Sequence, residues 1–170
     1  MKKFYIIALF ALTSVAVSAQ KYALVDMDYV MSAIPAYETA NEQLDMLSKK
    51  WQAEVEALLV QVQTMYKNYQ TEIVFLTDEA KTDRENQIIA KEKEANDLKR
   101  TYFGTEGELY KKREALVKPI QDEIYNAIQE LSNTKGYDLI FDKASSSSIV
   151  FAAPKIDISD ELLEKLGYSK

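Results

Sequence analysis

The chemistry open to this sequence is limited by the residue types that it lacks. Its 170 residues include no histidine and no cysteine. Histidine is the commonest general base and metal ligand, and protein zinc sites are built mainly from histidine and cysteine. Catalysis by carboxylates remains chemically possible, but nothing in the sequence pairs them in a recognisable pocket. Most of them have the pattern of charged residues on a solvated helix face. We therefore expect no catalytic, cofactor-binding or metal-binding residues, and we expect that the protein is not an enzyme.

The start of the chain has the pattern of a cleavable export signal. Lys2 and Lys3 precede an almost wholly apolar run over residues 4–17, and a small-residue exit ends at Ala19. We expect a signal peptide over residues 1–19, cleavage after Ala19 and an exported, soluble protein, with a buried first helix as the alternative. Since no cysteine follows and no later stretch reaches the ~20 apolar residues of a membrane span, we expect neither a lipid anchor nor stable membrane insertion.

The charge of the mature chain restricts its partners. Without Lys2 and Lys3, the chain carries 19 basic and 27 acidic residues, a net charge of −8. An acidic chain is a poor candidate for binding nucleic acid or an anionic membrane surface. We therefore expect no nucleic-acid partner.

Two narrow apolar stripes at the helical period dominate the rest of the sequence. The first has a mean spacing of about 3.6 residues, and the second begins with seven-residue steps. The polar segment "LTDEAKTDREN" separates them, which predicts a long antiparallel helical hairpin over residues 29–136 with its tip near 77–82. The members of the stripes are Leu44, Leu47, Trp51, Val55, Leu58, Val62, Met65, Tyr69, Ile73 and Leu76, and then Ile88, Ala95, Tyr102, Leu109, Leu116, Ile120, Ile124, Ile128 and Leu131.

Several residues have the positions expected of helix boundaries. Pro35 predicts a bend or a first helical turn, and Thr77 or Asp78 could cap the second helix. Gly136 is expected just beyond the end of the hairpin's second helix, and Pro119 inside the pattern predicts a kink. A short terminal helix is expected after a Ser159 cap, with Gly167 ending it.

Gly104 and Gly107 lie inside the second stripe, where each glycine costs about 1 kcal/mol relative to alanine. The seven-residue step from Tyr102 to Leu109 continues across them, so we expect a continuous but weakened helix. A local alternative is that Gly104 ends one segment and Thr105 with Glu108 forms a capping box for the next. We interpret the pair as a hinge that lets an arm swing; a tolerated irregularity without a role is the alternative. On this interpretation two alanines should raise stability by roughly 2 kcal/mol.

The two ends of the chain predict a small β-rich body over residues 20–28 and 137–170. An apolar run at Tyr22–Val25 indicates one strand, and runs at 139–141 and 149–152 flank the turn-like "KASSSS" as a β-hairpin. Three or four short strands make a marginal sheet, so we expect oligomerisation through apolar sheet surface. The expected interface residues are Leu24, Val25, Leu139, Phe141, Val150 and Phe151. The fold class is thus α+β, with a coiled-coil tentacle projecting from an oligomerisation body.

This layout resembles the Skp/OmpH family of periplasmic chaperones over nearly the whole mature chain. The resemblance comprises the N-terminal strand with "VDMDYVM", the charged helical hairpin, and the C-terminal "GYDLIFDK…IVFAAPKIDISDELLEKL". It implies a homo-oligomer, a trimer, whose tentacles enclose a cavity and hold unfolded outer-membrane proteins without ATP or any cofactor. The net charge of −8 departs from the basic family members, so neither a positive cavity nor lipopolysaccharide binding is inferred.

A holdase needs many weak apolar contacts along flexible arms. The candidate client-binding residues are the apolar residues off the main seam: Val74 and Phe75 near the tip, and Phe103 and Tyr110, which share one flank of the second helix. Their alternative role is to thicken the coiled-coil core. The alternative function is an exported structural spacer or tether without client-holding activity. A hydrolase using paired carboxylates is a third class, but it would need a concave site that two narrow helices do not supply.

Overall fold

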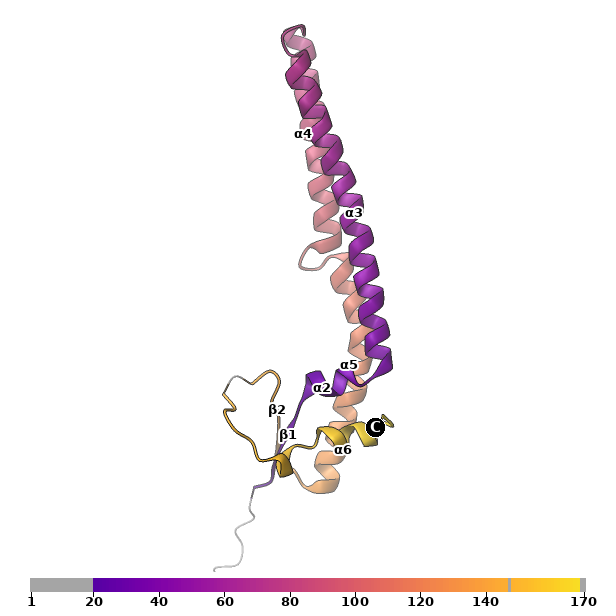
Figure 1. Ribbon diagram of the computed structural model, residues 1–170, viewed down its shortest axis with the longest axis vertical. Helices are drawn as coiled ribbons and strands as arrows, with labels where there is room; N and C mark the ends of the chain where they lie inside the picture. The colour runs from indigo at the N-terminus through magenta and orange to yellow at the C-terminus, as the bar shows by residue number, and fades with distance from the viewer. Residues whose placement is uncertain (1–19, 147, 169–170) are drawn as a thin grey trace, which may run out of the picture. The chain divides into compact units, whose positions relative to one another are not determined.

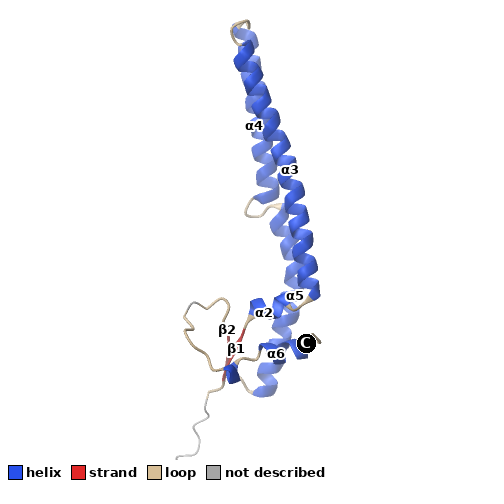
Figure 2. Ribbon diagram, in the orientation of Figure 1, coloured by secondary structure: helices blue, strands red, loops and turns tan. Residues whose placement is uncertain are grey.

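The computed structural model describes residues 20–146 and 148–168, which form two compact units. One unit, called the arm below, is residues 34–123; the other, called the body, combines residues 20–33 with 124–168. The body includes residues 29–33 and 124–136, which the sequence analysis assigned to the hairpin. Long helices and one small sheet confirm the α+β class (Figure 2). The predicted signal peptide lies outside the described residues.

The arm is an antiparallel pairing of α3 (Pro35–Glu72) with α4 (Asp78–Phe103) and the first part of α5 (Glu108–Lys135), as Figure 1 shows. Pro35 is at the first helical position, where its missing N–H needs no acceptor. The turn covers residues 73–77, slightly before the predicted tip. Thr77 caps α4 as predicted, because its hydroxyl oxygen accepts from Ala80 N at 3.3 Å.

The seam of the arm follows the predicted stripes. Every stripe residue in α3 and α4 is buried or partly buried, whereas most of the residues between them are exposed. Near the tip, Val62, Tyr69 and Ile88 form one buried cluster. Farther down the hairpin, Ala40, Leu44 and Val117 form another, with Leu109 and Leu116 packed against it. The spacing of apolar residues therefore predicted the packing face correctly.

The second helix of the hairpin is interrupted at residues 104–107, which corrects the expectation of a continuous helix. α4 ends at Phe103, with Gly104 extended at its C-cap, and α5 begins at Glu108. Lys111 N donates to Gly107 O at 3.1 Å, so Gly107 stands at the start of α5 and the predicted Thr105–Glu108 capping box is not formed. Of the local alternative, one part is confirmed: Gly104 ends a helical segment.

The body contains a two-stranded parallel sheet in place of the predicted β-hairpin. β1 (Tyr22–Val25) pairs in register with β2 (Leu139–Asp142). Residues 149–152 form no strand, so that expectation is wrong. The Asp142 carboxylate accepts from Ala144 N at 3.0 Å and turns the chain directly after β2, but the segment that follows makes no strand pairing, and its Val150 and Phe151 stay exposed. The apolar run at 139–141 takes its partner from the start of the chain instead.

The body core joins segments distant in sequence. Val30 of α2 (Met27–Ser32), Ile124 of α5 and Leu162 of α6 (Ser159–Lys165) are its largest fully buried side chains. η1 (Pro154–Ile156) leads into α6. Gly136 and Gly167 have φ of 68° and 86° just beyond α5 and α6, as the sequence predicted for helix-ending glycines. Pro119 lies inside α5, which continues through it.

Candidate functional site

The most exposed apolar side chains of the arm are at its tip. Val74 and Phe75 are 77% and 87% exposed, although their neighbours Ile73 and Leu76 pack into the seam. The sequence placed both residues off the seam, and the structure agrees with that placement. Free apolar surface of this kind is available for a partner and does not thicken the core.

Phe103 and Tyr110 lie on either side of the interruption at 104–107. Tyr110 is half-exposed. Phe103 is partly buried against the Tyr102 ring, edge to face, with centroids 6.3 Å apart, so core thickening accounts for part of its surface. It also lines an open groove of about 430 Å³ on the arm, together with Gln52, Val55, Glu56, Leu59 and Lys99.

An aromatic clamp holds α4 to α3 directly before the interruption. The rings of Trp51 and Tyr102 stack with centroids 4.8 Å apart and planes 8° from parallel. The Tyr102 hydroxyl donates to Glu54 Oε2 at 2.6 Å, and this hydrogen bond raises the pKa of Tyr102. The helix is thus pinned to its partner at one edge of the 104–107 loop. Leu109, which packs onto the Ala40–Leu44–Val117 cluster, pins it at the other.

In the body, the six residues expected at an oligomer interface fall into two groups. Leu24 and Val25 are buried within the single chain, so they contribute to internal packing and offer no surface to another subunit. Leu139 and Phe141 are about half-exposed on β2, and Val150 and Phe151 are 97% and 84% exposed. These four side chains, together with Tyr22 and Tyr125, are the exposed large apolar residues of the described body.

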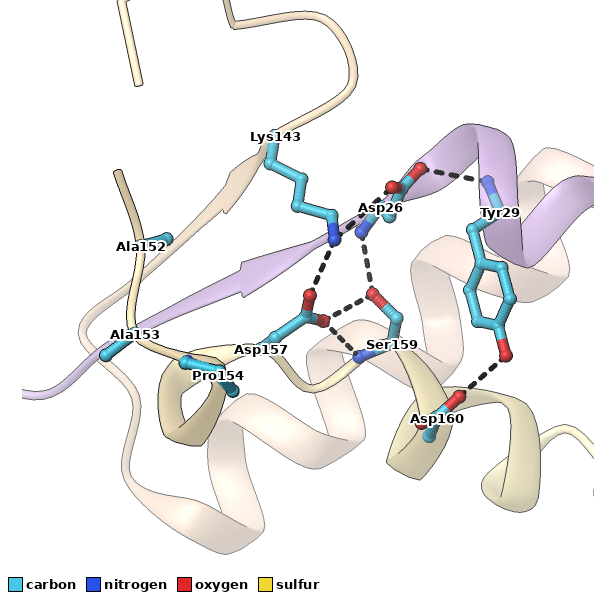
Figure 3. Close-up of a pocket in the computed structure, with 9 residues that line it drawn as sticks. All are labelled: Asp26, Tyr29, Lys143, Ala152, Ala153, Pro154, Asp157, Ser159 and Asp160. Carbon is cyan, nitrogen blue, oxygen red and sulfur yellow. Dashed lines mark hydrogen bonds and ion pairs between the residues drawn. The ribbon is translucent and has the colours of Figure 1, made fainter. Parts of the chain in front are cut away.

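A polar network at the carboxyl ends of the two strands lines a pocket of about 550 Å³ (Figure 3). Asp26 follows β1, and Lys143 follows β2. Lys143 Nζ lies 2.7 Å from Asp157 Oδ2 and 3.3 Å from Asp26 Oδ2. Figure 3 shows the lysine bridging the two carboxylates. One cation thus joins the ends of both strands to the segment before α6.

Ser159 completes the network and does not cap α6 as the sequence predicted. Its hydroxyl donates to Asp157 Oδ1 at 2.6 Å and accepts from Asp26 N at 2.8 Å. Asp157 Oδ1 also accepts from Ser159 N at 3.0 Å. Next to it, the Tyr29 hydroxyl donates to Asp160 Oδ1 at 2.7 Å. The "DISD" segment is therefore a connector between the two ends of the chain.

The network perturbs the ionisation of its members. Burial alone would raise the pKa of Asp157, but hydrogen bonds from Lys143 and Ser159 outweigh it and lower the pKa. The hydrogen bond to Asp157 in turn raises the pKa of Lys143. Burial likewise acts to raise the pKa of Asp142, while hydrogen bonds from Ser145, Met27 N and nearby backbone N–H groups lower it. Charged carboxylates and ammonium stabilise one another here, which is the signature of a structural ion pair.

Sequence reasoning missed this network. The signal was present as short polar interruptions after the apolar strands, in "VDMD", "FDK" and "DISD". Nothing in the sequence indicates that these segments, up to 133 residues apart, come together. Among the described residues, no group of three or more Asp or Glu side chains is arranged to hold a metal ion. No helix in the described part of the chain is long and apolar enough to cross a membrane.

In a comparison with known proteins, one family model matches almost the whole described chain. The family model described as "Outer membrane protein (OmpH-like)" matches residues 21–166. The chain belongs to the OmpH-like family. The match includes both strands, the helical arm and the polar network of the body, and it begins two residues after Ala19, where the predicted signal peptide ends.

A solved structure has the same OmpH-like fold. It is a crystal structure of a candidate outer membrane chaperone (OmpH-like) from Caulobacter crescentus CB15, with a TM-score of 0.65 and 12% sequence identity. The alignment covers 88% of this chain and 85% of that one. At this identity the likeness concerns the fold. No curated protein matches the sequence.

Proposed function

We propose that this OmpH-like protein is an ATP-independent periplasmic holdase that binds unfolded outer-membrane proteins between helical arms. The observation that carries the proposal is exposed apolar surface on a slender polar hairpin, at Val74, Phe75 and Tyr110. A soluble hairpin gains nothing from such surface on its own, because each exposed side chain forgoes about 1.5–3 kcal/mol of burial. The name of the solved OmpH-like structure, a candidate outer membrane chaperone, points the same way.

The client contacts assigned by this proposal are Val74, Phe75, Phe103 and Tyr110. They are spread along the arm and not gathered in one cavity, which suits many weak contacts with diverse clients. The groove beside Phe103 offers a second patch of apolar surface, and Leu59 is the exposed large apolar side chain that lines it. The binding needs neither a cofactor nor a nucleotide.

The test is whether the mature protein keeps a denatured outer-membrane β-barrel protein soluble at stoichiometric ratio after dilution from urea. Light scattering should stay at the buffer baseline with the wild-type protein. The variant Phe75→Ser with Tyr110→Ser should hold less client. The matched control Glu92→Gln with Glu114→Gln changes two exposed polar positions on the same arm and should behave as wild type. Aggregation at the rate seen without the protein would exclude the holdase function.

The second candidate function is an exported spacer or tether without a client. Cross-hairpin contacts favour it, because the Tyr69–Glu85 and Tyr102–Glu54 hydrogen bonds tie the two sides of the arm together. A spacer predicts stiff arms and no effect on client aggregation. The solubility assay separates the two functions directly.

We also propose that the protein is a homo-oligomer, a trimer, assembled through the body. The four exposed apolar residues Leu139, Phe141, Val150 and Phe151 supply the surface, on a body whose own sheet has only two described strands. Light scattering should give the mass of three chains. Phe141→Asp would bury a charge at such an interface and should yield monomers. A fully assembled and folded Phe141→Asp protein would show that β2 is not the interface.

The loop at 104–107 is the proposed joint of the arm. Both of its edges are pinned, at the Trp51–Tyr102 stack and at Leu109, so any movement is confined to the loop and the adjoining turns. Amide exchange across residues 103–108 should then be faster than in α3 at the same level. Equal protection would favour a fixed irregularity.

A further inference from the structure

The turn at the arm tip presents two apolar side chains in a fixed position. Ile73 and Leu76 are packed against the Val62–Tyr69–Ile88 cluster. Phe75 N donates to Glu72 O at 2.9 Å, and Ile73 N donates to Tyr69 O at 2.9 Å. The turn is thus anchored on both sides of Val74 and Phe75, whose side chains are left in solvent.

Cross-hairpin contacts hold the helices together directly below this turn. The Tyr69 hydroxyl donates to Glu85 Oε1 at 2.5 Å, and Arg84 pairs with Glu72 at 3.5 Å. Within α4, Lys81 pairs with Asp78 at 3.2 Å. The tip is therefore organised before it meets a partner, and little conformational entropy remains to be lost on binding.

The apolar pair lies within an acidic stretch of the sequence. Residues 72–85 contain five acidic and two basic residues, a net charge of −3. Both basic residues are already engaged in the ion pairs just described. Glu79 and Asp83 are exposed and have no cation within ion-pair distance in the described part of the chain. The tip thus combines an apolar contact with uncompensated carboxylates.

We propose that the arm tip selects client segments in which a large apolar residue is flanked by lysine or arginine. This inference rests on the proposed holdase function and specifies the class of segment that the function takes. Phe75 and Val74 supply the apolar contact, while Glu79 and Asp83 attract the flanking cations. A segment flanked by aspartate or glutamate meets like charge at the same place and binds weakly.

The charge also distinguishes a polypeptide from a lipid surface as the occupant. An anionic membrane would bring negative headgroups against Glu79 and Asp83. Membrane-surface segments instead carry lysine and arginine beside their apolar residues. A basic, unfolded polypeptide matches both parts of the tip.

The test uses two fluorescent peptides with the same apolar core around one phenylalanine, one flanked by lysines and the other by glutamates. Binding to the full mature protein is measured by anisotropy at low and at high salt. The lysine-flanked peptide should bind about tenfold more tightly at low salt, because several weak attractions between exposed unit charges act together. The difference should shrink at high salt.

Matched variants locate the effect. Glu79→Gln with Asp83→Asn should remove the preference, whereas Glu92→Gln with Glu114→Gln removes the same charge elsewhere on the arm and should keep it. Phe75→Ser should weaken binding of both peptides. Equal binding of the two peptides, or a preference that survives Glu79→Gln with Asp83→Asn, would overturn the proposal.

Two further measurements separate this inference from the holdase function. If the wild-type protein keeps a denatured barrel protein soluble but shows no charge preference, the tip assignment fails and the function stands. If it does neither, both fail. Co-sedimentation with phosphatidylcholine or phosphatidylglycerol vesicles should be negligible, and vesicle binding that Phe75→Ser abolishes would assign the tip to lipid and overturn the proposal.

Discussion

The arm and the body bury their apolar residues by different means. The arm uses one repeated contact, in which residues three and four apart on each helix form a seam, so its clusters combine neighbours along two helices. The body relies on contacts between the two ends of the chain, such as Met27 N with the Asp142 carboxylate, 115 residues apart. We therefore expect a substitution in the seam of the arm to weaken the packing only locally, whereas a substitution in the core of the body should destabilise the whole body.

The largest effect is expected from a cavity in the body. Leu162 is fully buried and Leu44 in the arm is 6% exposed. Replacing either by alanine should lower the free energy of unfolding by about 2–5 kcal/mol, with Leu162→Ala near the upper limit and Leu44→Ala near the lower. A narrow seam can close around a lost side chain more easily than a core enclosed on all sides. Urea unfolding at one protein concentration measures both, and a larger loss at Leu44 would contradict the contrast.

Next in size is the loss of the body's polar network. Asp157→Ala removes the acceptor for Ser159 N and Ser159 Oγ and one carboxylate partner of Lys143. We expect a loss of about 1–3 kcal/mol, because the donors are left without partners. Asp157→Asn keeps an acceptor and should lose less. Unfolding free energies equal to wild type in both variants would show that water replaces the carboxylate without cost.

A comparable effect is expected at the interruption in the arm, with a sign opposite to the one the sequence suggested. A Cβ at Gly104 would lie 2.5 Å from Arg100 O, and one at Gly107 would lie 2.8 Å from Tyr102 O. Gly107→Ala should therefore destabilise the arm by about 1–3 kcal/mol, as overpacking does. Thermal unfolding checks the direction, with Thr105→Ala in the same loop as the control. A raised melting temperature would mean that the loop converts to the continuous helix first expected.

A smaller effect on stability is expected from changes in pH, and its acid part is assigned to the body. The pKa values of Asp142 and Asp157 are lowered from their ordinary 3.8, so the body gains stability above that pH and loses it as the pH falls through the lower folded values. In the arm, the hydrogen bond to Glu85 raises the pKa of Tyr69 to about 12. That contribution is present below pH 10 and lost as the pH rises toward 12.

Circular-dichroism melts across pH test this assignment. Asp157→Asn should flatten the acid limb, and Tyr69→Phe should remove part of the alkaline limb without changing the acid one. The raised pKa values of Lys135 and Lys143 add a body contribution that is also lost above pH 10.5. An acid limb unchanged by Asp157→Asn would show that Asp157 is not its source.

The smallest effect on stability is expected at the arm tip. Phe75→Ser removes a side chain that is 87% exposed, so the free energy of unfolding should change by no more than about 0.5 kcal/mol. Client holding should fall nonetheless. The pair of measurements, urea unfolding and the client solubility assay, separates binding surface from core. A large stability loss would show that Phe75 packs on the seam.

The seam was predictable because a helix repeats its geometry every few residues. Val55, Val62 and Ile88 were assigned to it from spacing alone, and they are buried. The glycine pair was interpreted less well, since spacing shows that Tyr102 and Leu109 share a face but not that the backbone between them leaves the helix. Sequence could name Val74 and Phe75 as off-seam residues, but their exposure depends on how the turn is anchored by Ile73 and Leu76.

By itself, the sequence determined the α+β class, the antiparallel hairpin and the helix-ending glycines, because each follows from contacts between near neighbours or from one residue's backbone preference. Only the tertiary structure decided that β1 pairs with β2 in parallel, that residues 149–152 form no strand, and that Lys143 joins Asp26 to Asp157. The strand pairing and the Lys143–Asp26 ion pair unite segments more than 100 residues apart along the chain. No local periodicity encodes which distant partner a short apolar strand takes.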